Sequence, residues 1–391
     1  MTYELSPEHE AFRHSVREFA EKEVAPHVAQ WDRDHYFPVE VVQKMGELGL
    51  FGLTSPEEYG GAGEDGDFTS LCVAIEELGR VDQSIGITLE AGVGLGINPM
   101  LTYGTEEQKQ TWLPDLVAGK TLAGFGLTEP GSGSDAGAMR TKADLDGDEW
   151  VVNGAKQFIT NSGSTMTSVV NVAARTGTRP DGRPEVSTII VPAGTPGFTA
   201  EPAYDKLGWH ISDTHPLTFE NARVPKENLL GERGRGYAQF LATLDDGRVA
   251  IAALAVGLIQ GCLDLCVEYA GQRTTTGGVT IGSKQGVAFQ IADLEVMLQA
   301  SRLLTYKAAA MKDADAPVGA FKQAASVAKL YTSESAVTAT RIATQIFGGY
   351  GFMEEYPVAR FYRDAKILEI GEGTSEVQRI LIARGLGLPV E

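Results

Sequence analysis

The hydrophobic pattern of the chain changes twice along its 391 residues, and this double change is the strongest constraint on its fold. Over residues 1–120 apolar side chains recur every three or four positions, as in amphipathic helices. Residues 121–230 instead hold short alternating runs between Gly, Pro, Asp and Asn, as expected of strands. Helical spacing returns in residues 231–391. We predict a mainly α-helical protein with an N-terminal helical domain, a central antiparallel β domain and a C-terminal helical bundle.

Local signals place individual helices within the two helical regions. Ser6 is a good N-cap and Pro7 suits a first helical position, so a helix is predicted to begin there. Long segments with few breaks in the C-terminal part predict the antiparallel helices of a bundle. The other helices predicted from apolar spacing cover residues 39–48, 68–80, 106–118, 237–271, 287–313, 317–346 and 375–385.

The charge balance excludes some classes of partner. With 33 basic and 52 acidic residues the net charge is -19, which disfavours nucleic acids and anionic membrane surfaces. The longest apolar run, Val249–Ile259, is far shorter than the roughly 18 to 20 residues of a bilayer span. The N-terminal residues show neither a secretory signal nor an Arg-rich transit segment. We therefore expect a cytoplasmic protein without a membrane span.

The cysteines and histidines form no recognisable disulfide or metal pattern. Cys72, Cys262 and Cys266 are too few for a disulfide framework or a zinc site, and we interpret them as small core residues. The six histidines form no H-E-x-x-H or similar cluster. We therefore expect no bound metal.

A glycine-rich segment, AGFGLTEPGSGSDAG, could bind a nucleotide. Gly131, Gly133 and Gly137 give G-x-G-x-x-x-G, which differs from the G-x-G-x-x-G dinucleotide fingerprint. The residues that follow predict strand, turn and strand around Asp146–Gly147, where the fingerprint needs a helix. Backbone N–H groups and hydroxyls of such a loop can still hold a phosphate or a flat ring. The alternative interpretation is a surface loop between strands.

A carboxylate near the C-terminus stands where it could approach a ligand. Glu372 lies between Gly371 and Gly373, which give it little steric cover. Ser375 and Gln378 predict a capping box at the start of the helix that follows. The alternative is that Glu372 only interacts favourably with the dipole of this helix.

Several separated motifs together resemble one family. The chain resembles the acyl-CoA dehydrogenases, flavoenzymes that introduce a double bond between the α and β carbons of an acyl-CoA thioester. The resemblance spans nearly the whole chain in family order, and the family's helical, β, helical architecture agrees with the pattern above. The matching segments are EEYGG (57–61), GLTEPGSGSD (126–135), NGAKQFITN (153–161), FENARVPKENLLGERGRGY (219–237), QIFGGYGF (345–352) and RDAKILEIGEGTSEVQR (363–379).

The resemblance implies that FAD is bound outside any dinucleotide-binding fold. An aromatic side chain can cover the flat flavin while hydroxyls meet its polar edge. The family grips the rest of the FAD partly from a neighbouring protomer, which implies a homotetramer. Here Thr276 replaces the family's Phe in that element, and one extra residue precedes Gln285. The implied flavin contacts are Leu127, Thr128, Ser134, Phe158 and Thr160; the remaining FAD contacts are Arg273, Gln345, Gly348, Gly349, Thr374 and Glu376.

The resemblance also assigns the substrate channel and the chemistry. Ser134, Leu244, Asp245, Arg248 and Gly373 match positions along the family's acyl-CoA channel. An ion pair between Arg248 and a neighbouring aspartate is the alternative to a contact with CoA.

The resemblance further makes Glu372 the general base for the α-proton. Some family members place this glutamate at the position of Gly247, and glycine cannot act as a base. Electron-transferring flavoprotein is the implied electron acceptor. The alternative functions are an acyl-CoA oxidase or a flavin monooxygenase on the same scaffold, or a non-catalytic binding protein.

Overall fold

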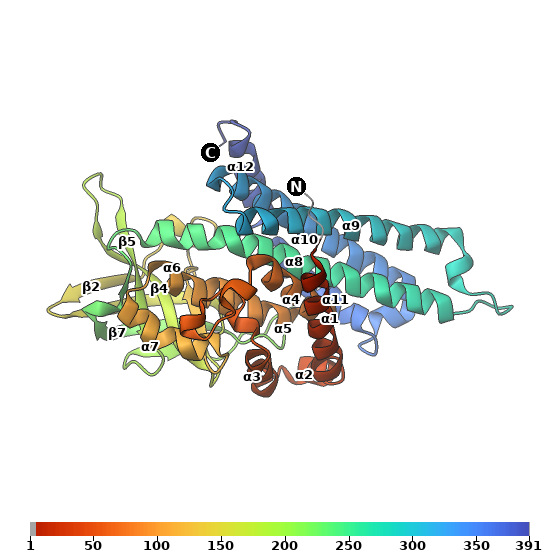
Figure 1. The fold of residues 1–391 in the computed structure, drawn as a ribbon, viewed down its shortest axis with the longest axis horizontal. Coiled ribbons are helices and arrows are strands. Elements are labelled where there is room, and N and C mark those ends of the chain that lie inside the picture. Colours follow the sequence, from red (N-terminus) through yellow and green to blue (C-terminus); the bar gives the residue numbers. More distant parts are fainter. Residues whose placement is uncertain (1–4, 391) are drawn as a thin grey trace.

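The structure is a computed structural model that describes residues 5–390. Long helices run along the molecule, a sheet lies at one end, and the first helices lie along one side (Figure 1). The predicted order of helices, sheet and helices is confirmed.

The N-terminal part is helical and begins as the sequence predicts. Ser6 caps the first helix: its Oγ accepts a hydrogen bond from the His9 backbone N–H at 3.2 Å, and Pro7 is the first helical residue. The predicted helices at 39–48, 68–80 and 106–118 are present within a residue or two. The helices are α1 (Pro7–Phe19), α2 (Val28–Asp34), α3 (Val39–Glu47), α4 (Phe68–Val81), α5 (Gln83–Glu90), α6 (Asn98–Tyr103) and α7 (Glu106–Val117).

The apolar spacing did not predict the helical stretch after α4. It consists of α5, a π-helical segment at Ala91–Ile97, and α6. Residues 82–94 are all buried, so no polar face marks the helical period in the sequence. This buried stretch carries Glu90 into the interior.

The central part is one eight-stranded sheet in the order β6-β7-β3-β2-β4-β5-β8, with β1 also paired to β4. The sheet is mainly antiparallel, as predicted, but β1 runs parallel to β4, and β2 meets β4 in parallel at one residue pair. A long connection through β2 and β3 separates β1 from β4, and such a connection permits parallel pairing. The strands are β1 (Leu122–Gly126), β2 (Lys142–Asp146), β3 (Glu149–Thr160), β4 (Thr167–Thr178), β5 (Pro184–Pro192), β6 (Phe198–Ala200), β7 (Thr214–Pro225) and β8 (Leu229–Leu230).

The C-terminal part is a helical bundle built around α8. This helix packs against α4, α9 and α10, and Figure 1 shows it running from the sheet towards the opposite end of the molecule. The three cysteines are buried core residues on α4 and α8, as predicted. The helices are α8 (Gly236–Gln272), α9 (Gln285–Asp313), α10 (Val318–Phe347), α11 (Pro357–Ala365) and α12 (Ser375–Gly385).

Helix α8 is more apolar than its longest uninterrupted apolar run suggests. By length and composition alone it could cross a membrane, because leucines and cysteines extend the apolar character beyond Ile259 with few interruptions. Most of this stretch is buried inside the protein. Its apolar surface therefore forms the centre of the bundle.

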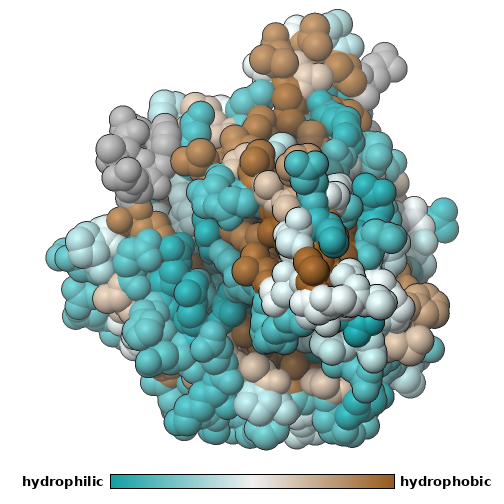
Figure 2. Space-filling model, turned by 90° about the vertical axis from the view of Figure 1, so that its right-hand side faces the viewer, coloured by the Kyte–Doolittle hydropathy of each residue, from teal (hydrophilic) through white to brown (hydrophobic). Residues whose placement is uncertain are grey.

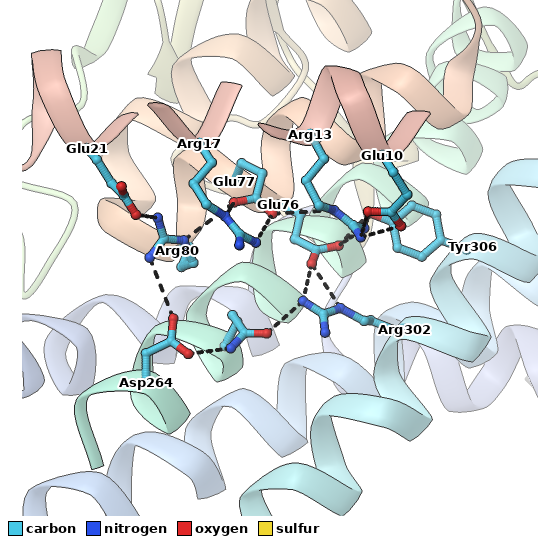
Figure 3. A network of polar contacts seen from close by, with 11 residues as sticks. Glu10, Arg13, Arg17, Glu21, Glu76, Glu77, Arg80, Asp264, Arg302 and Tyr306 are labelled. Atoms are coloured by element: carbon cyan, nitrogen blue, oxygen red, sulfur yellow. Dashed lines mark hydrogen bonds and ion pairs between the residues drawn. The ribbon is translucent and has the colours of Figure 1, made fainter. Parts of the chain in front are cut away.

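A network of charged side chains ties α1 to the bundle (Figure 3). The carboxylate of Glu77 on α4 has no exposed surface and lies 2.8 Å from Arg17, 3.4 Å from Arg13 and 3.4 Å from Arg80. Three guanidinium groups thus surround one buried anion. The network is completed by Glu10 on α1, Glu21, Glu76 on α4, Gln260 and Asp264 on α8, and Arg302 and Tyr306 on α9.

Candidate active site

The predicted base Glu372 sits on a strained turn between α11 and α12. Its φ of 50° lies in the left-handed region, which is unfavourable for a residue with a side chain. Gly373 follows with a φ of 94°, so the glycine is needed there. The Oε2 atom of Glu372 is enclosed, and no nitrogen or hydroxyl donor in residues 5–390 gives it a hydrogen bond. The turn therefore presents a carboxyl oxygen without a fixed donor inside the protein.

This carboxyl oxygen lies directly against α8. A Cβ atom added to Gly247 would lie 1.9 Å from Oε2 of Glu372, far inside van der Waals contact. Gly247 is buried in the middle of a long helix, where glycine is otherwise unfavourable. The close approach of the carboxylate explains the glycine, because a larger side chain would collide with it.

A second buried carboxyl group, Glu90 at the end of α5, was missed by the sequence analysis. Neither of its oxygens has a hydrogen bond from a fixed donor in residues 5–390. Burial and the neighbouring charge of Glu372 raise the pKa of Glu90 well above its ordinary value. Glu90 therefore keeps its proton and can donate it in a hydrogen bond to Glu372. A lone glutamate in the apolar stretch SIGITLEAGVGLG was the available signal.

The pKa of Glu372 results from opposing effects. Burial raises the pKa to about 7, while the hydrogen bond with Glu90 and the charges of Lys329 and Arg248 lower it. A carboxylate with a pKa near 7 is matched to accept a proton at neutral pH.

Lys329 on α10 is the other residue that the sequence analysis did not find. Its side chain is fully buried, and Nζ donates to the carbonyl oxygen of Gly373 at 2.8 Å. Burial lowers the pKa of Lys329 to about 8, so the side chain is still largely charged at neutral pH. Lys329 thus holds the turn that carries Glu372 and places a positive charge near it.

The predicted substrate residues Leu244, Asp245 and Arg248 share one turn of α8. Arg248 Nη1 forms an ion pair with Asp245, and both side chains are almost completely buried. Lys322 Nζ also lies 3.3 Å from Asp245. Arg248 is thus ion-paired in the structure, and its contact with CoA stays a prediction.

The glycine-rich loop (residues 127–141) packs against the start of α8. Leu127 is buried in an apolar cluster with Phe240, and Leu244 packs on the same cluster. The Thr128 carbonyl accepts a hydrogen bond from the Gln157 backbone N–H at 2.8 Å. Ser134 lies at the exposed tip of the loop. The loop is thus fixed near its base, while its tip is open to a ligand.

Strand β3 presents an exposed aromatic residue beside this loop. Phe158 is 59% exposed and has a φ of 62°. It lies at an irregularity in the β3–β7 pairing, and its ring centroid is 5.2 Å from that of Tyr204. Thr160 ends the strand and is partly exposed. An exposed aromatic surface next to hydroxyls and free loop backbone fits a flat ring such as flavin.

A second group of predicted FAD residues lies at the far end of the bundle. Arg273, Gly348 and Gly349 line an open pocket of about 510 Å³. The Arg273 guanidinium carbon lies 5.8 Å from the centroid of the Tyr350 ring, and Gln345 lies just outside the pocket lining. Figure 2 looks at this side of the molecule and shows hydrophobic residues running between hydrophilic ones.

The two groups of predicted FAD residues are far apart within one chain. The glycine-rich loop approaches Tyr237 near the start of α8, whereas the pocket is lined by Tyr269 near its end. At 1.5 Å per residue, these two positions on the helix are about 50 Å apart. One chain alone therefore cannot bring both groups to one FAD molecule.

The cap of α12 differs from the predicted capping box. The helix begins at Ser375, so its N-cap is Thr374, whose Oγ1 accepts a hydrogen bond from the Val377 backbone N–H at 3.3 Å. The side chain of Gln378 instead donates to the Gly373 carbonyl at 2.9 Å. Glu376 is exposed in the first turn. The predicted N-cap, Ser375, is one residue after the observed one, because both Thr374 and Ser375 are good N-cap residues.

Comparison with known protein families identifies the class of protein. Family models for the N-terminal, middle and C-terminal domains of acyl-CoA dehydrogenases match residues 6–120, 124–222 and 234–387. The chain is 48% identical to a probable acyl-CoA dehydrogenase of Bacillus subtilis, over 99% of this chain and 100% of the relative. It is 43% identical to the short-chain specific acyl-CoA dehydrogenase of Mus musculus mitochondria, over 97% and 90%. The chain therefore belongs to the acyl-CoA dehydrogenase family and is an oxidoreductase.

Solved structures show the same likeness. Butyryl-CoA dehydrogenase from Megasphaera elsdenii superimposes with a TM-score of 0.94 at 40% identity, covering 99% of this chain and 100% of the other. A chain from work on the electron-transferring flavoprotein of Acidaminococcus fermentans gives 0.93 at 41% identity, covering 99% of each. A glutaryl-CoA dehydrogenase of Mycobacterium smegmatis in complex with FADH2 gives 0.91 at 30% identity, covering 98% and 95%.

Proposed function

We propose that the protein catalyses α,β-dehydrogenation of an acyl-CoA thioester with Glu372 as the general base. The observation that carries the proposal is the Glu372 carboxyl, whose Oε2 is enclosed and held on a strained turn against Gly247, with a pKa of about 7. Backbone strain of this kind persists where the surrounding structure enforces it, often at active sites. FAD, when bound, supplies the acceptor for the hydride that leaves the β-carbon.

The residues around Glu372 have distinct roles in this proposal. Glu372 removes the α-proton, and its backbone N–H helps to hold the thioester carbonyl on which negative charge develops. Glu90 keeps its proton and hydrogen-bonds Glu372, which restrains the rise in the pKa of Glu372. Lys329 fixes the turn through the Gly373 carbonyl.

We propose that two chains share each FAD. The glycine-rich loop and Phe158 of one protomer would hold the flavin, and the pocket around Arg273 of a neighbour would hold the rest. The separation of these groups along α8 supports this arrangement. The FADH2 complex of the Mycobacterium relative supports the choice of FAD as the cofactor. In a homotetramer built as a pair of dimers, symmetry gives every FAD site residues from two chains.

The proposed partners follow from the relatives. Electron-transferring flavoprotein is the proposed acceptor, supported by the similar chain from the Acidaminococcus study. A short acyl group is the first substrate to test, because the short-chain specific relative is 43% identical. A cytoplasmic location is part of the same proposal, and the burial of α8 is compatible with it.

Anaerobic stopped-flow measurement of flavin bleaching with acyl-CoAs of increasing length tests the proposal. We expect yellow protein that releases FAD on denaturation and is bleached by at least one acyl-CoA. Glu372→Gln should retain FAD and slow bleaching by roughly 10² to 10⁴-fold, as expected on loss of a positioned base. Glu47→Gln, a matched change at an exposed position on α3, should bleach at the wild-type rate.

Two results would refute parts of the proposal. A colourless protein that FAD does not reconstitute would contradict the function, although not the fold. Wild-type bleaching by the Glu372→Gln variant, with its FAD content verified, would mean that Glu372 is not the base. Repeating the experiment in air distinguishes the alternatives, because rapid reoxidation of the reduced protein by oxygen would favour an oxidase or a monooxygenase.

A further inference from the structure

A buried ion pair lies at the base of the glycine-rich loop. Lys156 Nζ on β3 is 2.8 Å from Oε1 of Glu129, and the two side chains are 0% and 5% exposed. Burial lowers the pKa of Lys156 to about 8, while the charge of Glu129 opposes this shift. The pair is therefore largely ionised at neutral pH, although ions are expensive to bury.

Glu129 closes the base of the loop. Its Oε2 accepts a hydrogen bond from the Arg140 backbone N–H at 2.5 Å, and its Oε1 accepts one from the Thr141 backbone N–H at 2.9 Å. Lys156 Nζ also donates to the Leu127 carbonyl at 3.1 Å. A single ion pair thus joins both ends of the loop to strand β3.

The tip of the loop is connected to this base through Glu129. A Cβ atom added to Gly131 or Gly133 would meet no atom of the described chain within 4 Å, and Ser134 is exposed. Few atoms of the described chain therefore contact the tip at these positions. Within the loop, Glu129 and Ser132 exchange two backbone hydrogen bonds, and the Ser132 Oγ donates to the Asp135 carbonyl. Glu129 takes part in this bonding and in the ion pair, so the base and the tip are connected through it.

The same short stretch of β3 also orients the exposed aromatic side chain of Phe158. Lys156 precedes Phe158 by two residues, and the β3–β7 pairing is irregular between Lys156 and Ile159. Irregularities of this kind often redirect a side chain next to a functional site. Between these residues, the Gln157 backbone N–H donates to the Thr128 carbonyl. The ion pair, the loop and Phe158 are therefore one connected unit.

From this connection we infer that Lys156 and Glu129 are positioning residues for FAD, which hold the loop in its binding shape before the cofactor arrives. The inference rests on the proposed FAD-dependent function. Stability alone explains the pair poorly, since apolar residues of similar volume often replace a buried ion pair at little cost. A loop ordered in advance does not have to be ordered on binding, so it binds more tightly.

The test compares FAD binding by apoprotein variants. Lys156→Met removes the charge and the donors at similar length, and Glu129→Gln keeps the shape and one acceptor. We expect the Kd for FAD to rise by at least about tenfold in Lys156→Met, which corresponds to about 1.4 kcal/mol, and by less in Glu129→Gln. The visible spectrum of bound flavin should also change. Lys226→Met, which removes an exposed pair with Asp148 at 2.5 Å in the same domain, should leave both unchanged.

Each outcome bears on the inference. A Lys156→Met variant that melts earlier but keeps the wild-type Kd for FAD and the wild-type flavin spectrum would overturn it, because the pair would then be only structural. If Lys156→Met does not fold, Glu129→Gln decides in the same way. Failure of the wild-type apoprotein to bind FAD would instead contradict the proposed function, so the two failures are distinguishable.

Discussion

Gly247 on α8 leaves room for the carboxylate of Glu372, because a Cβ atom at position 247 would lie 1.9 Å from Glu372 Oε2. The two residues come from different segments and meet in the interior. Glu372, which we propose as the base, thus fills the space next to the position where the resemblance places the base of some family members. Only one of the two positions can hold a glutamate without rearrangement.

We expect Gly247→Ala to displace the Glu372 carboxylate and slow flavin bleaching by about 10²-fold, since small misplacements of reacting groups have effects of this size. FAD content should not change. The control is Gly271→Ala near the end of the same helix, where an added Cβ would meet no described atom within 4 Å. Equal bleaching rates in the two variants would show that the methyl group is accommodated without moving Glu372.

Glu372→Gln should stabilise the protein at high pH and not at low pH. The unfolded chain releases this proton near the ordinary value of 4.5, whereas the folded protein holds it up to about pH 7. The contribution of this carboxyl to the stability of the wild type is therefore fully present below pH 4.5 and is lost as the pH rises through 7, whereas glutamine does not titrate. Thermal melts at pH 5 and pH 8 should show a higher Tm for the variant mainly at pH 8. The same gain at both pH values would contradict a raised pKa.

Glu90→Leu should shift the pH dependence of flavin bleaching to higher pH. Protonated Glu90 hydrogen-bonds Glu372 and lowers the pKa of Glu372, and leucine cannot donate that bond. Glu90→Gln keeps a donor and should resemble the wild type. The measurement is the bleaching rate from pH 5 to 9 at saturating substrate. A Glu90→Leu profile that coincides with that of the wild type would mean that Glu90 does not act on Glu372.

Arg273→Ala should weaken FAD retention without destabilising the apoprotein, because Arg273 is exposed in the pocket at the end of the bundle. Its neighbour Gln272 is also exposed, and within the described residues its side chain hydrogen-bonds only Glu268. Gln272→Ala is therefore the control. The FAD content after dialysis and the light-scattering mass are measured for both. Equal FAD content in the two variants would exclude Arg273 from the cofactor site.

Glu77→Gln should reduce the free energy of unfolding by several kcal/mol, since removing one partner of a buried ion pair typically costs about 3–5 kcal/mol. The arginines Arg13, Arg17 and Arg80 would lose their shared anion. Glu10→Gln removes a half-exposed carboxylate that pairs with Arg13 at 2.9 Å and should change little. Urea unfolding at fixed protein and FAD concentrations compares the two. Similar midpoints would show that water or rearrangement replaces the buried anion.

The amino-acid sequence determined the local structure well. Ser6 and Pro7 marked the start of α1, and apolar spacing predicted the extents of α8, α9 and α10 within about two residues. These features depend on which face of a short segment is buried, and the spacing of the apolar residues within that segment indicates this face. Glu372 was found for a similar reason, because its flanking glycines and the matching motif are adjacent in the sequence.

Only the tertiary structure decided which distant residues meet. The spacing did not predict α5 and the π-helical segment after it, since a stretch buried on every side has no polar face to reveal its period. Glu90 and Lys329 reach Glu372 only through packing of α5 and α10 around the turn before α12. Likewise, the sequence marks Lys156 only as a strand residue. Its position beneath the glycine-rich loop follows from the packing of that loop against β3. Burial and ion pairing arise between segments, so the pKa values and the shape of the site are properties of the packed protein.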